Sequence, residues 1–199
     1  MKKYIILKII KLIKINILES DFMYYTNIYI SPISKILLAC DNIGLTGLWF
    51  EGEKYYANNL DTKHKEMEHS IFEKVKLWLD IYFSGKEPNF TPPIHMIGSS
   101  FRIAVWEILC QIPYGKTITY GKIADIIAKQ KGISHMSAQA IGGAVGHNEI
   151  SIIIPCHRVV GANGSLTGYA GGIDKKIKLL SLEGVNMEHL FIPKKGNAL

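Results

Sequence analysis

The sequence has few of the residues that build disulfide frameworks or cysteine-rich metal sites. Its three cysteines, Cys40, Cys110 and Cys156, lie far apart and form no CxxC pair. This spacing excludes a small disulfide-stabilised scaffold and favours a reducing compartment, so we expect a cytoplasmic protein.

Metal-ligand spacing and long apolar runs are also lacking. His64, His69 and His95 do not have the spacing of a metal site, and we expect neither a metal nor a cofactor. Beyond residue 22, no segment approaches the length that a membrane-spanning helix needs, so no membrane association is expected.

Positive charge is in excess, but it is unevenly distributed. The formal net charge is +6, and residues 1–22 contribute +3 of it through five lysines against one Glu and one Asp. Two interpretations of this segment remain open. Either translation starts at Met23, or the segment is an amphipathic surface helix in which Lys8, Lys11 and Lys14 line one side. A signal peptide is disfavoured because lysines interrupt the apolar stretch.

The remaining chain has a globular composition and two styles of patterning. With 48% hydrophobic and 20% charged residues, it has enough apolar sequence for one core or two small ones. Residues 24–50 alternate short β-branched and aromatic runs with turn signals, which predicts an antiparallel meander. Residues 68–83 place apolar side chains at helical spacing and predict one amphipathic helix packed on that sheet.

A Pro-, Gly- and Ser-rich stretch, residues 84–100, separates this unit from a mainly helical one. We therefore expect four parts: an extension, a sheet-plus-helix domain, a mainly helical domain and a tail. Their bounds are 1–22, 23–93, 94–190 and 191–199.

The second unit contains a candidate helix-turn-helix. A helix capped by Ser99 or Ser100 precedes it; the next helix starts near Thr119 and stops at Gly132, and a short helix rich in Ala and Gly follows. Two short helices joined by a glycine-containing turn also fit an ordinary helical hairpin. The small side chains of the second helix cost helix stability but allow another surface to approach closely. They include Ala138, Gly142 and Gly143.

The ten residues "IIIPCHRVVG", 152–161, place a cysteine between a proline and a histidine. The consecutive isoleucines predict a strand buried on both faces that stops at Pro155, which leaves Cys156 rigidly held but reachable just past the strand end. The alternative is that Cys156 is a small buried hydrophobic residue, as free cysteines commonly are.

The stretch "IPCHRVVGANGSLTGYAGG", preceded by "IGGAVGHNEISII" and followed by "KLLSLEG", closely resembles the O6-alkylguanine-DNA alkyltransferases. The resemblance runs from about Gly98 to Val185. It implies a fold with an α/β N-terminal domain, made of a small antiparallel sheet plus a helix, followed by a mainly α C-terminal domain with a winged-helix-like helix-turn-helix.

By this resemblance, Cys156 accepts the alkyl group from guanine O6. A free thiol, with a pKa of about 8.5, is only a few per cent ionised at neutral pH and needs a base. The resemblance makes His157 that base, acting through a water, and Glu183 the carboxylate that orients it, as in a catalytic triad. It also makes Asn148 the brace of the active-site turn.

The same resemblance assigns residues to the base pocket. The Tyr120 hydroxyl meets guanine N3, and Tyr169 and Gly171 lie in the loop that closes over a flipped base. The Ala170 amide meets guanine O6. Carbonyls of Cys156 and Val159 accept from the exocyclic amine, which distinguishes guanine from adenine.

For DNA, the resemblance implies that the second short helix enters the minor groove of double-stranded DNA carrying alkylated guanine, with the nucleotide flipped out. Gln139 occupies a position where the family commonly has an arginine that fills the gap left by the base. The loop "KQKGISHMS" before it is also longer than in some members. We expect a monomer that acts once per molecule, on O6-alkylguanine and also on O4-alkylthymine.

Two other classes remain. A non-catalytic lesion-binding relative would lack the cysteine, which is present here. A cysteine hydrolase would turn over repeatedly on acyl substrates, but its histidine is expected to be remote in sequence. A regulatory helix-turn-helix protein is a further alternative, although no sensor domain is evident.

Overall fold

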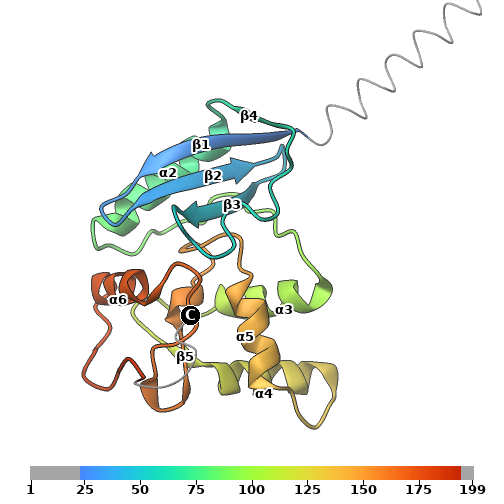
Figure 1. The fold of residues 1–199 in the computed structure, drawn as a ribbon, viewed down its shortest axis with the longest axis vertical. Helices are drawn as coiled ribbons and strands as arrows, with labels where there is room; N and C mark the ends of the chain where they lie inside the picture. Colours follow the sequence, from blue (N-terminus) through green and yellow to red (C-terminus); the bar gives the residue numbers. More distant parts are fainter. Residues whose placement is uncertain (1–22, 194–199) are drawn as a thin grey trace, which may run out of the picture.

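The computed structural model describes residues 23–193. The interpretations of residues 1–22 lie outside these residues. The chain forms a sheet unit stacked on a helical unit (Figure 1). In the sheet, β1 (Tyr24–Ile30), β2 (Lys35–Cys40) and β3 (Leu45–Phe50) are antiparallel neighbours, as the turn signals predicted. A short strand β4 (His64–Glu66) pairs parallel to β1 and was not predicted, because its three residues are all exposed and have no apolar pattern.

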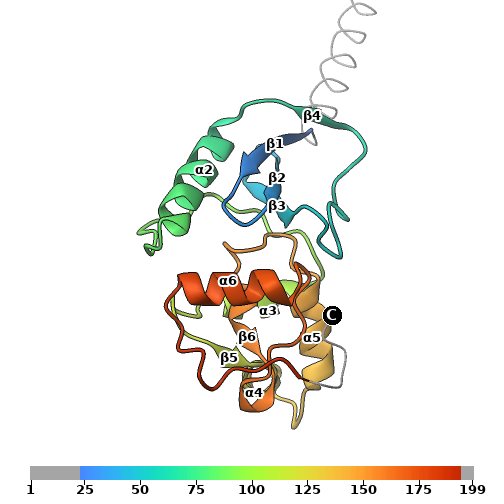
Figure 2. The ribbon, with the colours of Figure 1, turned by 60° about the vertical axis from the view of Figure 1, so that its left-hand side comes forward.

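The predicted amphipathic helix is α2 (Ser70–Phe83), which covers one face of the sheet (Figure 2). Its helical spacing is confirmed, since the residues predicted to face inward are buried. They are Ile71, Phe72, Val75, Leu79 and Tyr82. The His69 ring caps its start by accepting a hydrogen bond from the Ile71 amide.

The helical unit contains the predicted helix-turn-helix. It begins with α3 (Ser100–Leu109), which the Ser99 hydroxyl caps. The pair itself is α4 (Tyr120–Lys131), capped by Thr119 and ended by Gly132 in the left-handed conformation, and α5 (Ala138–Gly146). The helix α6 (Ile173–Leu182) packs above them in Figure 2.

Short elements complete the helical unit. Two-residue strands β5 (Ile118–Thr119) and β6 (Val159–Val160) pair in parallel, and two 3-10 turns, η1 (Cys156–Arg158) and η2 (Ala162–Gly164), flank β6. One continuous apolar core extends through both units.

The predicted strand over residues 152–154 is wrong. These isoleucines are buried, but the backbone folds back on itself, with the Ile153 amide bonded to the Ser151 carbonyl and the Ile154 amide to the Ile150 carbonyl. Ile152 has φ +70°, a conformation that a β-branched residue rarely adopts. Burial of all three side chains holds a tight turn here, so the apolar run reflected core packing and not strand geometry.

The two units are joined at the strand β3. The Leu48 amide donates to the Glu149 carbonyl at 2.8 Å, and the Ser151 amide donates to the Leu48 carbonyl at 2.9 Å. The Trp49 indole also donates to the Glu149 carboxylate at 2.9 Å. The sheet therefore hydrogen-bonds directly to the segment that leads into Cys156.

Candidate active site

A buried carboxylate organises one side of the site. Glu183, at the end of α6, accepts from His157 Nε2 at 2.7 Å and from Arg158 at 2.8 and 3.0 Å, the latter as a two-pronged pair. The Tyr82 hydroxyl of α2 donates to the same carboxylate at 2.8 Å, and the Gly115 amide does so at 3.2 Å. Both carboxylate oxygens are thus occupied by donors from three different segments: η1, α2 and the loop at Gly115.

These contacts fix the ionisation of the pair. Burial alone would raise the pKa of Glu183, but the bonds from His157 and Arg158 hold it at about 2. Burial lowers the pKa of His157, although Glu183 acts against this. Because Nε2 faces a carboxylate, it carries the ring proton, and Nδ1 has no hydrogen-bond partner among the described residues. His157 is therefore a neutral imidazole with Nδ1 open to accept a proton.

Cys156 begins η1, beside Asn148. The Asn148 amide nitrogen donates to Cys156 Sγ at 3.0 Å and to the Ile154 carbonyl at 2.8 Å, so it braces the turn and the sulfur together. The thiol is only 3% exposed, and burial raises its pKa to about 12. The expectation of a reachable thiol is wrong for this conformation, because the preceding isoleucines turn into the core and do not end a strand at the surface.

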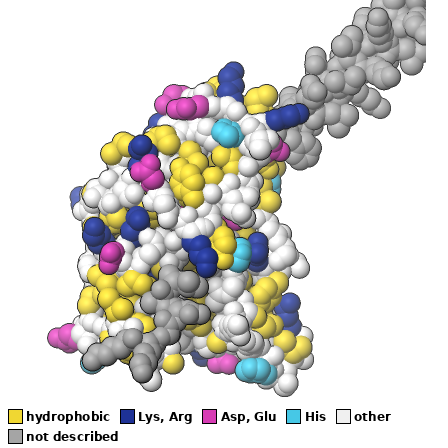
Figure 3. Space-filling model, in the orientation of Figure 1, with side chains coloured by type: hydrophobic (Ala, Val, Ile, Leu, Met, Phe, Trp, Pro, Cys, Tyr) yellow, Lys and Arg dark blue, Asp and Glu magenta, His cyan; other side chains and the backbone are white. Residues whose placement is uncertain are grey.

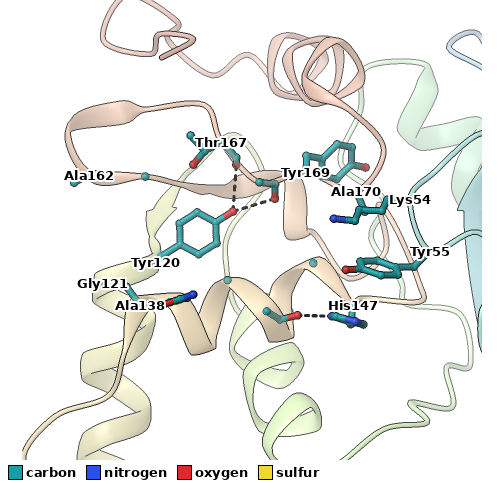
Figure 4. A pocket seen from close by; sticks show the side chains of 16 residues that line it. Lys54, Tyr55, Tyr120, Gly121, Ala138, His147, Ala162, Thr167, Tyr169 and Ala170 are labelled. Atoms are coloured by element: carbon teal, nitrogen blue, oxygen red, sulfur yellow. Dashed lines mark hydrogen bonds between the residues drawn. The ribbon is translucent and has the colours of Figure 1, made fainter. Parts of the chain in front are cut away.

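A cavity of about 760 Å³ opens in front of the buried cluster, between α5 and the loop that contains residues 167–170 (Figure 4). Tyr120 and Tyr169 line it, and Cys156 is not among its lining residues. The pKa values of both tyrosines are raised, mainly by burial and further by the charge of Cys156. The ring of Tyr169 also contacts His157, the residue next to Cys156, so the wall of the cavity adjoins the buried cluster.

Tyr120 also closes the cavity loop. Its hydroxyl donates to the carbonyls of Thr167, at 3.2 Å, and Gly168, at 3.0 Å. Gly168 has φ +68°, and a Cβ there would lie 2.7 Å from the Tyr120 oxygen, so this contact requires glycine. The ring of Tyr169 meets the edge of His157 with centroids 6.4 Å apart. The loop is thus held on one side by Tyr120 of the cavity lining and on the other by His157 of the buried cluster.

The structure sorts the predicted site residues into three groups. The buried cluster contains Cys156, His157, Asn148 and Glu183. The cavity is lined by Tyr120, Ala138, Gln139, Gly142, Gly143, Tyr169 and Ala170. Val159 and Gly171 do not line the cavity, and the Val159 carbonyl already accepts a hydrogen bond from Lys176.

Comparison with known protein families decides the family. The model described as "6-O-methylguanine DNA methyltransferase, DNA binding domain" matches residues 100–185, and the model of that family's ribonuclease-like domain matches residues 23–96. The chain belongs to the 6-O-methylguanine DNA methyltransferase family.

Relatives of this family member come from bacteria and archaea. A methylated-DNA--protein-cysteine methyltransferase of Haemophilus influenzae is 41% identical over 164 residues, which cover 82% of this chain and 87% of the relative. One from Methanosarcina mazei is 44% identical over 168 residues, which cover 83% of this chain and 100% of the relative.

Solved structures agree with the fold. The Mycobacterium tuberculosis O6-methylguanine methyltransferase matches with a TM-score of 0.69 and 39% identity, over 81% of this chain and 93% of that one. A structure of the M. tuberculosis protein in complex with DNA also has a TM-score of 0.69, with 38% identity, over 81% of this chain and 92% of that one.

Sequence reasoning missed three groups in the methyltransferase site. Tyr82 comes from 101 positions away, so no local pattern could have paired it with Glu183. Arg158 directly follows His157 in the sequence. Since His157 was expected to pair with the Glu183 carboxylate, the neighbouring positive charge could have indicated a second partner for that carboxylate. Lys176 is fully buried and donates to the Thr167 carbonyl at 2.7 Å; burial lowers its pKa to about 8.

Residues 23–193 contain no group of three or more His, Cys, Asp or Glu side chains placed to hold a metal ion. No helix within the same span has the length and apolarity required to cross a membrane.

Proposed function

We propose that this protein repairs alkylated DNA by transferring the alkyl group of O6-alkylguanine, and of O4-alkylthymine, to Cys156, once per molecule. The observation that supports this best is the chain of hydrogen bonds behind the cavity, which links Glu183 to His157 and Asn148 to Cys156. Glu183 orients His157 through Nε2, and this leaves Nδ1 as the base on the side available to a thiol. Asn148 fixes the sulfur next to this pair.

The buried thiol needs a coupled base. With a pKa of about 12, ionising it at pH 7 without a proton acceptor costs about 7 kcal/mol. In the proposed reaction, the thiol proton passes through a water molecule to His157 Nδ1, and the resulting imidazolium is stabilised by Glu183. The sulfur then forms a bond to the alkyl carbon as the bond from that carbon to guanine O6 breaks.

The leaving guanine takes up negative charge, which a donor at its edge stabilises. In this proposal, the Tyr120 hydroxyl exchanges its bonds to Thr167 and Gly168 for one to guanine N3. The loop then loosens, and the alkyl group reaches the enclosed sulfur. The Ala170 amide meets guanine O6, and the Cys156 and Val159 carbonyls accept from the exocyclic amine.

DNA access follows from the open face of α5. A Cβ built at Gly142 or Gly143 would meet nothing within 4 Å, so a duplex can approach the backbone there. We propose that α5 lies in the minor groove of one duplex, that a monomer suffices, and that the base is flipped into the cavity. Gln139, which lines the cavity, would hydrogen-bond to the orphaned base without supplying a cation.

The test is stoichiometric transfer from a duplex labelled in its O6-methyl group. We expect one added methyl per protein, mapped to Cys156, and no second turnover, because the thioether formed is not reversed by ordinary reductants. Cys156→Ala should abolish transfer and retain DNA binding. Demethylation by Cys156→Ala, or many methyl groups released per protein, would refute the proposal and favour a hydrolase.

A further inference from the structure

We propose that the turn after β3, through Lys54 together with Tyr55 and His147, forms a phosphate-binding shelf that extends the DNA interface from α5 onto the sheet unit. This inference rests on the proposed function. It means that the sheet unit contacts the DNA backbone directly, next to the minor groove in which α5 would lie.

The shelf belongs to the same cavity as the helix-turn-helix. Lys54, Tyr55 and His147 line one end of it, and Tyr120 lines the other (Figure 4). The Tyr55 and His147 rings are stacked, with centroids 4.1 Å apart and planes 22° from parallel. A base flipped into this cavity would bring its flanking phosphates to the cavity rim, where the shelf lies.

Hydrogen bonds on both sides hold the shelf in place and leave the Lys54 side chain for another partner. The Lys54 amide donates to the Ala170 carbonyl at 3.0 Å, so the turn is tied to the cavity loop through the main chain. A ring nitrogen of His147, Nδ1, lies 2.7 Å from the Gly143 carbonyl of α5 and donates to it. The shelf is therefore preorganised on both sides.

The ammonium group of Lys54 is available for a phosphate. Lys54 is exposed, and its Nζ lies 5.4 Å from the centre of the Tyr55 ring. Among residues 23–193 it forms no ion pair with a carboxylate. A lysine is a compact point charge that pairs readily with phosphate, and the Tyr55 ring limits its freedom at little cost.

The acidic residues of the turn are directed elsewhere. Glu51 pairs with Lys35 at 3.8 Å. Glu53 is buried, with its carboxylate on Ser151 and the Phe50 amide. The positive charge of Lys54 is thus not neutralised on the cavity side. Figure 3 shows basic and histidine side chains across the middle of this face, where the two units meet.

The experiment uses the full chain and the variant Lys54→Gln, with DNA affinity measured against salt concentration by fluorescence anisotropy. Losing one phosphate contact should reduce the slope of log affinity against log salt by about 0.9 and weaken binding about eight-fold at 0.1 M salt. The loss should be the same for duplexes of different sequence, since a phosphate carries no base information. Lys54→Arg should retain the wild-type slope.

Lys74→Gln is the matched control, because Lys74 is exposed and belongs to α2, a helix that lies far from α5 in Figures 1 and 2. It should leave the slope unchanged. Alkyl transfer from a free O6-alkylguanine nucleoside, which has no flanking phosphates, should fall far less in Lys54→Gln than transfer from a duplex does.

The outcomes separate the shelf from the proposed function. Wild-type protein that transfers methyl groups, with Lys54→Gln showing the wild-type salt slope, would overturn the shelf alone. Wild-type protein that neither binds duplex nor accepts methyl groups would overturn both. A Lys54→Gln protein that loses nucleoside transfer as well would show that Lys54 acts on the chemistry and not on phosphate, which also overturns the shelf.

Discussion

The two sides of the site differ in the residues that form them. Behind the cavity, Glu183 accepts hydrogen bonds from donors in three segments, and His157 and Lys176 are fully buried. In front of it, α5 presents glycines whose side-chain positions are open, with Gln139 as its polar lining residue. The buried side consists of ionisable groups paired by hydrogen bonds, whereas the surface of α5 carries almost no side chains.

This difference corresponds to two physical tasks. A proton relay works only when its groups keep one geometry and one ionisation state, and buried, fully paired groups provide both. A surface that must admit a duplex closely benefits from having nothing to displace, even at a cost in helix stability. Perturbing the buried side should therefore affect stability and chemistry together, whereas perturbing the open side should separate binding from stability.

Glu183→Gln should have the largest effect. It leaves the buried Arg158 without its counter-charge and His157 without the carboxylate that stabilises its protonated form. We expect the free energy of unfolding to fall by about 3–5 kcal/mol and the transfer rate to fall by about 100-fold or more. Urea unfolding and single-turnover methyl transfer would measure the two effects.

Glu149→Gln is the matched control, because that carboxylate accepts from the Trp49 indole and an amide oxygen can replace it there. It should change stability and transfer rate little. If Glu183→Gln proved as stable and as active as Glu149→Gln, the buried cluster would have no part in the relay.

Much of the fold was predictable because local patterns and local caps agree. Helix α2 carried an unbroken apolar period, and α4 had Thr119 at its start and Gly132 at its end. Those boundaries predicted two short helices, and the family resemblance was needed to prefer a helix-turn-helix over an ordinary helical hairpin. Turn signals between β-branched runs likewise predicted the three antiparallel strands.

The predictions that failed concern segments whose conformation is set by tertiary contacts. Three isoleucines, 152–154, form a buried turn because Asn148 and Leu48 bind the neighbouring backbone, which no apolar pattern reveals. Cys156 is buried because the isoleucines before it turn into the core, which the apolar run did not reveal. The Cys156 and Glu183 positions were inferred from resemblance; the sequence alone offered no reason to join a carboxylate of α6 to Tyr82 of α2.

Glu53→Gln should have the second-largest effect. It tests how a carboxylate of the sheet unit influences stability and the ionisation of Cys156. Glu53 accepts from the Ser151 hydroxyl at 2.8 Å and from the Phe50 amide at 2.9 Å, through different carboxylate oxygens. In glutamine, the amide oxygen can accept from the Phe50 amide and the NH2 group can donate to the rotated Ser151 hydroxyl, as the protonated carboxyl would. Burial, followed by the charge of Glu149, raises its pKa to about 7 against the bonds from Ser151 and Phe50 and the charge of Lys175. Its ionised form also raises the pKa of Cys156.

Because the pKa of Glu53 is higher in the folded state than in the unfolded state, its stabilising contribution is present below about pH 4.5 and is lost as the pH rises to about 7. Glu53→Gln should therefore gain up to about 3 kcal/mol over wild type above pH 7 and match it at low pH. It should also transfer methyl groups faster at pH 8. Unfolding and transfer measured from pH 5 to 8.5 test this, and a constant difference between the two proteins across that range would contradict it.

Gly143→Ala should have the smallest effect on stability and the clearest effect on binding. Its added methyl group meets no protein atom within 4 Å and improves helix propensity, so the free energy of unfolding should rise by about 0.5–1 kcal/mol. The same methyl group intrudes where the duplex approaches, which should weaken DNA binding by about 1 kcal/mol or more, as overpacking does elsewhere. Ala140→Gly, on the same helix but outside the cavity lining, is the reciprocal control. It should lose stability and keep its affinity for DNA; if Gly143→Ala also kept its affinity, the open face of α5 would not be the surface that meets the duplex.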